Sequence, residues 1–108
     1  MGHPVFTISA DTYSRLENIL AETNSTITII PDARNDRLGI IAAYLCTRPT
    51  GAGVKLVVRR IEQTPADKLM LVVMANSPLT HKLEESKLTD TIKECLIRAG
   101  AVKGWTGD

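Results

Sequence analysis

Residue types that commonly carry out chemistry are few in this sequence, and their spacing does not build an active site. His81 and Glu84 lie three positions apart, as half of a carboxylate–histidine metal site would on a helix, but no second copy of the pair follows, so a surface pair is expected. Cys46 and Cys95 both fall in apolar segments, which favours reduced core thiols over a disulfide or a nucleophile. We therefore expect no catalytic residues, no metal site and no cofactor, and a protein that is not an enzyme.

The glycine-rich segment at residues 51–55, Gly-Ala-Gly-Val-Lys, differs from a phosphate-binding Walker loop. Such a loop needs Ser or Thr directly after its lysine and then a helix, whereas Lys55 is followed by Leu56 and by a β-prone run. We interpret this segment as a turn between two strands.

The composition sets the size and class of the protein. With 108 residues, 44% of them hydrophobic and 23% charged, the chain fits one globular domain over residues 1–108, with residues 100–108 expected as a loose C-terminal tail. No apolar run approaches the ~18 residues of a membrane-spanning helix. The first residues also lack the layout of a signal peptide. Together with reduced cysteines, these features predict a cytoplasmic protein.

Hydrophobic periodicity predicts an alternation of strands and helices. The β-prone runs are residues 4–8, 25–30, 54–63 and 68–75. The runs with helical spacing are residues 10–23 and the segment between Pro78 and Gly100. Residues 38–47 are ambiguous, because their apolar spacing suits a helix while Gly39 and the Ile40-Ile41 pair disfavour one, and we favour a strand.

These elements occur in the order β-α-β-β-β-β-α. Strands joined by short turns pair as antiparallel neighbours. The order therefore predicts an α+β fold in which two helices pack on one face of an antiparallel meander sheet, giving two layers.

The strand patterns predict a second apolar surface. Two helices cover one face of such a sheet, yet residues 38–47 and 68–75 are apolar on both faces. The uncovered face is expected to expose Ile41, Leu45, Val57, Ile61, Met70, Val72 and Met74. A patch of this kind usually marks an interface. We expect an interaction domain that forms a homodimer or docks on another protein, with Lys55 and Arg59 at the rim of the contact. In the alternative, residues 79–83, the tail around Trp105 or the first strand covers this face.

The arginines suggest a second possible function. Five of the seven arginines fall in residues 33–60, although the net charge of the chain is only +1. The candidate anion-binding residues are Arg34, Arg37, Arg48, Lys55, Arg59 and Arg60. Arginine pairs with phosphate and carboxylate through two parallel hydrogen bonds, so these residues could bind nucleic acid or another phosphate-containing anion. The low net charge and the four scattered aromatic residues favour the protein-binding interpretation.

Overall fold

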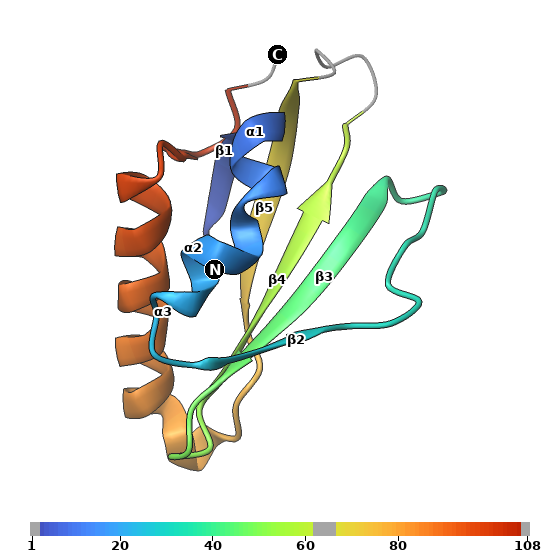
Figure 1. Cartoon of the computed structure of the whole chain (residues 1–108). Helices are drawn as coiled ribbons and strands as arrows, with labels where there is room; N and C mark the ends of the chain where they lie inside the picture. The colour runs from blue at the N-terminus through green and yellow to red at the C-terminus, as the bar shows by residue number, and fades with distance from the viewer. Residues whose placement is uncertain (1–2, 62–66, 107–108) are drawn as a thin grey trace.

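The computed structural model describes residues 3–61 and 67–106. Within these residues, one antiparallel sheet has six strands: β1 (Val5–Ser9), β2 (Thr26–Ile29), β3 (Ile40–Thr47), β4 (Gly53–Arg59), β5 (Lys68–Ala75) and β6 (Val102–Lys103). The helices are α1 (Ala10–Ser14), α2 (Leu16–Ala21) and α3 (Lys82–Arg98), with a 3₁₀ turn η1 (Leu79–His81) before α3. The predicted two-layer α+β fold is confirmed (Figure 1).

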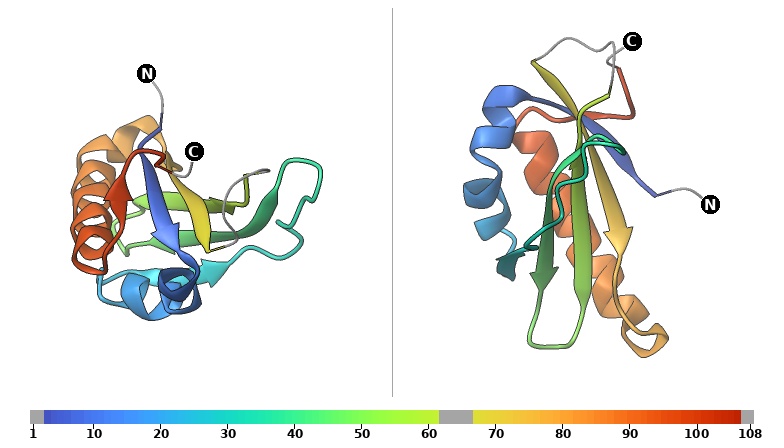
Figure 2. Two further views of the ribbon diagram at one scale, coloured as in Figure 1. Left: turned by 90° about the horizontal axis from the view of Figure 1, so that it is seen from above. Right: turned by 90° about the vertical axis from the view of Figure 1, so that its right-hand side faces the viewer.

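The strands follow the order β2-β3-β4-β5-β1-β6 across the sheet. Strands β2 to β5 form the predicted meander, and β1 returns to pair with β5. In the right-hand view of Figure 2 the strands lie in front of α3, and no helix of the described chain lies in front of them. One face of the sheet is thus covered by helices, and the other is referred to below as the open face.

The ambiguous segment at residues 38–47 is confirmed as a strand. β3 pairs with β4 from Ile40 to Thr47, across one bulge, and its second half, from Tyr44 to Thr47, also pairs with β2 on the other side. Gly39 ends the preceding turn with a φ of +73°, a conformation that L side chains rarely adopt. Pairing on both sides outweighs the helical spacing of the apolar residues.

The first predicted helix is divided into two short ones. The Oγ of Ser9 accepts a hydrogen bond from the backbone N–H of Thr12 at 3.0 Å and caps α1. At Arg15 the chain leaves the helical conformation (φ −106°, ψ 8°), and its N–H donates to the carbonyl of Thr12, which tightens the turn. The apolar residues that gave residues 10–23 their helical spacing continue into α2, where Leu16 and Leu20 are fully buried.

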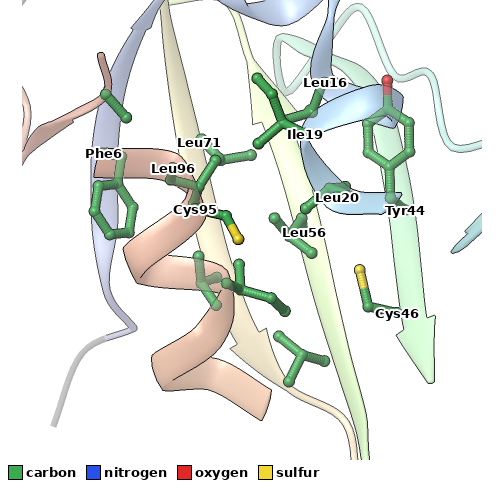
Figure 3. Packing of buried hydrophobic residues seen from close by; sticks show 14 of the residues in the cluster. Phe6, Leu16, Ile19, Leu20, Tyr44, Cys46, Leu56, Leu71, Cys95 and Leu96 are labelled. Atoms are coloured by element: carbon green, nitrogen blue, oxygen red, sulfur yellow. The ribbon is translucent and has the colours of Figure 1, made fainter. Parts of the chain in front are cut away.

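The core lies between the helices and one face of the sheet (Figure 3). Phe6 of β1, Leu56 of β4 and Leu71 of β5 meet Leu96 of α3 there, and each is at most 1% exposed. The predicted apolar stripe of the last helix is confirmed, with these buried members: Leu88, Ile92, Cys95 and Leu96.

Part of the segment that we expected to be a loose tail is held by the sheet. β6 pairs with β1, and the Oγ1 of Thr7 donates a hydrogen bond to the carbonyl of Gly104 at 2.7 Å. The same Oγ1 accepts a hydrogen bond from the N–H of Thr106 at 2.8 Å. Because Thr7 points away from the core side of β1, residues 104–106 cover the β1 end of the open face.

β2 is the strand at the other edge of the sheet. Residues 24–31 contain no charged side chain, and Ile29 is 55% exposed. Beyond β2, residues 30–39 extend past the strands and are called the arm below (Figure 1). The arm returns to the sheet at the start of β3.

Candidate binding surface on the open sheet face

The strand register determines which side chains share the open face, because directly paired residues point to the same side. Three cross-strand rows lie on this face: Leu45–Lys55–Met74, Ala43–Val57–Val72–Val5 and Ile40–Arg59–Met70–Thr7. Five of the seven predicted interface residues are among them: Leu45, Val57, Met70, Val72 and Met74. The sequence pattern therefore placed most of this set on one face.

The prediction for Ile41 is corrected by the register. A bulge between Ile40 and Ala42 leaves Ile41 without a partner in β4, and its side chain packs against the core cluster. Ile40 is paired with Arg59 and takes the expected position on the open face. One extra residue in a strand breaks the strict alternation on which the prediction depended. Ile61 lies beyond the end of β4, outside the rows.

The members of this set are only partly exposed. Val57 is 8% exposed, and the six others are of intermediate burial. Cross-strand neighbours shield one another, and Leu38 of the arm lies beside them with 55% of its surface exposed. The open face therefore presents a compact hollow rather than a broad flat patch.

We call this feature the apolar hollow. It is an open depression of about 370 Å³, and it is lined by Leu38, Ile40, Lys55, Val57, Arg59, Val72 and Met74. Five of these residues are hydrophobic and two are cationic. The side-chain ammonium of Lys55 makes no hydrogen bond or ion pair with any described residue of the chain.

A second hollow of about 590 Å³ lies at the base of the arm, and we call it the arginine hollow. Its charged walls are Arg34, Arg37, Arg59, Arg60 and Asp36. The remaining walls are Leu38, Gly39, Ile41 and Ile61. Among the described residues, four arginines and one acidic residue thus line this hollow.

Backbone and side-chain hydrogen bonds fix the base of the arm. Asn35 and Ile40 exchange two backbone bonds of 2.9 and 3.0 Å, and the N–H of Arg60 donates to the carbonyl of Gly39 at 2.7 Å. Nε and Nη2 of Arg59 both donate to the carbonyl of Leu38, at 3.1 and 2.9 Å. The arm is therefore tied to the end of β4.

The arginines differ in what they already contact. Nε of Arg34 lies 3.0 Å from Oδ1 of Asp36, in an exposed ion pair. Arg37 makes no hydrogen bond or ion pair within residues 3–61 and 67–106. Arg59 has five N–H donors, and its bonds to Leu38 use two of them.

Four of the six predicted anion-binding residues meet in the arginine hollow, and two do not. Lys55 lines the apolar hollow instead. Arg48 follows the far end of β3, where its Nη2 donates to the carbonyl of Thr23 at 2.9 Å. Arg48 therefore ties the β3–β4 turn to the end of α2, away from the other arginines.

The residues that the sequence analysis considered for metal binding or nucleophilic chemistry lie in ordinary structural contacts. Oε1 of Glu84 lies 3.3 Å from Nζ of Lys87. No group of three or more metal-ligating side chains occurs in the described ranges. Burial raises the pKa of the Cys46 thiol to about 11, so this thiol stays protonated and unreactive near neutral pH.

Comparison of the chain with protein-family models, curated proteins and solved structures finds no match. None of the described helices is both long and apolar enough to cross a membrane.

Proposed function

We propose that this chain is a non-enzymatic interaction domain that binds a segment of another protein on its open face. The single observation that carries the proposal is the apolar hollow. It gathers hydrophobic walls from the arm, β3, β4 and β5 on a face over which no described helix lies.

The hollow is suited to accept apolar side chains. Burying one large hydrophobic side chain gains about 1.5–3 kcal/mol, so two or three such side chains would offset part of the entropic cost of association. The walls come mainly from paired strands, which change little on binding. Specificity would come from the cationic groups of Lys55 and Arg59, because each must find a polar partner when covered.

The proposal is tested with peptides selected from a random library displayed on phage, using the immobilised full chain as bait. Selected peptides are then labelled, and their affinity is measured by fluorescence anisotropy. Leu38→Asp should lower the affinity at least about tenfold, because it places a carboxylate in the apolar wall. Leu38 is 55% exposed, so the fold should tolerate the change.

Leu83→Asp is the matched control. Leu83 is 70% exposed and lies in the first turn of α3, in the helix layer. An acidic residue there suits the helix dipole, so this variant should bind as the wild type does. Failure to select any peptide, or equal binding by Leu38→Asp, would contradict the proposal. A dimer in sedimentation that Leu38→Asp converts to a monomer would assign the face to a second copy of the chain.

A second candidate function is the binding of nucleic acid or another phosphate-containing anion, and the four arginines of the arginine hollow favour it. Among the described residues, no aromatic side chain lines either hollow to stack on a base. Titration with labelled RNA and DNA oligonucleotides tests this function. Nucleic-acid binding requires an affinity that falls steeply with salt and weakens in Arg37→Ala.

A further inference from the structure

Resting on the proposed function, we infer that the bound segment carries acidic side chains next to its apolar ones, and that the arginine hollow binds these carboxylates. The recognised chemistry is thus an acidic, partly hydrophobic peptide. The inference depends on how the two hollows are joined and on their charge.

The two hollows are adjacent parts of one surface. Leu38 and Arg59 line both of them, with Leu38 on the arm and Arg59 on β4. An extended segment that fills the apolar hollow can therefore continue into the arginine hollow. The hydrophobic and cationic parts of the surface then act on the same ligand.

The surface carries a clear excess of positive charge. Among the described residues that line the two hollows, there are five cationic side chains, Lys55 and four arginines, and one acidic side chain, Asp36. Arg37 has no partner among the described residues, so a ligand carboxylate would not have to displace an existing bond there. Guanidinium groups bind carboxylates through paired hydrogen bonds, which adds orientation as well as affinity.

The backbone that carries the cationic residues, and the Arg59 side chain, are held in place before the ligand arrives. The hydrogen bonds of Asn35, Gly39 and Arg59 hold the arm against β4. Ordering side chains on binding costs about 0.5–1.5 kcal/mol for each long side chain. A guanidinium that is already fixed, such as that of Arg59, avoids most of this cost.

The same charges disfavour a second copy of the chain as the occupant. A twofold dimer formed through the open face would bring two equivalent surfaces together. Lys55, Arg37 and Arg59 of both copies would then lie in one interface, and gathering so many like charges there is unfavourable. The acidic side chains of α1 and α2 lie in the other layer. An acidic partner is the complementary choice.

The test uses the peptides selected from the random library. We expect them to be enriched in Asp and Glu beside aliphatic or aromatic residues. Replacing the acidic positions with Asn and Gln should weaken binding about tenfold or more. Raising the salt concentration from about 50 to about 500 mM should weaken binding of the original peptide by a similar factor, because exposed charges are screened.

Charge reversal on the protein provides the matched comparison. Arg37→Glu should weaken the acidic peptides about tenfold and leave their Asn/Gln versions nearly unchanged. Lys93→Glu makes the same change in net charge on α3, which contributes to neither hollow. This control should bind both peptide versions as the wild type does.

The outcomes separate the two proposals. The inference would be overturned by selected peptides that lack acidic residues, or by peptides that bind Arg37→Glu as tightly as the wild type. The interaction function would still stand in that case if Leu38→Asp abolishes binding. Tight, salt-sensitive binding of oligonucleotides in place of peptides would overturn both. Equal weakening by Arg37→Glu and Lys93→Glu would show an effect of net charge alone and would also overturn the inference.

Discussion

Raising the pH from about 8 to about 10.5 should destabilise the protein through two buried acidic groups, Cys46 and Tyr44. Burial raises the pKa of Cys46 from 9.0 to about 11. Burial, followed by the proximity of Tyr13 and Glu17, raises the pKa of Tyr44 from 10.0 to about 12. Both groups are protonated and neutral in the folded protein, and both release their protons more readily once the chain unfolds.

The sign and size of the effect follow from this difference. Because the folded pKa exceeds the unfolded one, the full stability is present below about pH 9 and is lost as the pH rises through the folded values. At about pH 10.5 the loss is about 2 kcal/mol from Cys46 and about 1 kcal/mol from Tyr44. A total near 3 kcal/mol is a large fraction of the stability of a small domain.

Urea unfolding at several pH values, followed by circular dichroism, measures this loss. The double variant Cys46→Ala/Tyr44→Phe removes both titrating groups while keeping the aromatic ring. It should be less stable at pH 8, because the Sγ of Cys46 is fully buried. Its stability should nevertheless fall far less between about pH 8 and about pH 10.5. Parallel losses in the wild type and the double variant would refute the assignment to these two groups.

Three further changes test how the fold is held. Ser9→Ala removes the side-chain cap of α1 and should cost about 1 kcal/mol in urea unfolding. Gly39→Ala places a Cβ against the carbonyl of Arg60 at a positive φ, so it should cost at least about 1 kcal/mol and displace the arm, visible as chemical-shift changes at its base. Thr7→Val removes the two hydrogen bonds to the chain around residue 105, and amide exchange in residues 102–106 should accelerate with little loss of global stability.

The sequence pattern was sufficient for the sheet and for most of the open face. Period-two alternation in β4 and β5 placed Val57, Val72 and Met74 on one side, because the pairing of these strands is regular. The same reasoning failed at Ile41, since a bulge changes the face of a side chain without changing the composition of the strand. β6 was missed because a pairing of two residues leaves no periodic signal.

The convergence of the arginines could be predicted only in part. Their concentration in residues 33–60 was visible, but their meeting depends on a backbone hydrogen bond between Gly39 and Arg60, which are far apart in the chain. Gly39 itself, placed after the polar residues of the arm, was the available signal, because a glycine with positive φ commonly closes a short turn before a strand. The exposed fraction of the apolar side chains on the open face could not be predicted either. It depends on how neighbouring strands and the arm shield residues such as Val57.

The outer border of β2 has a consequence for handling the protein at high concentration. Natural proteins usually protect an edge strand with lysine, proline or a bulge, because an unprotected edge can pair with a strand of another molecule. Here β2 itself consists only of Thr and Ile, residues 24–31 carry no charge, and the proline, Pro31, lies beyond the end of the strand. Slow turbidity on concentration is the expected result, and Thr28→Lys should suppress it while leaving the melting temperature unchanged.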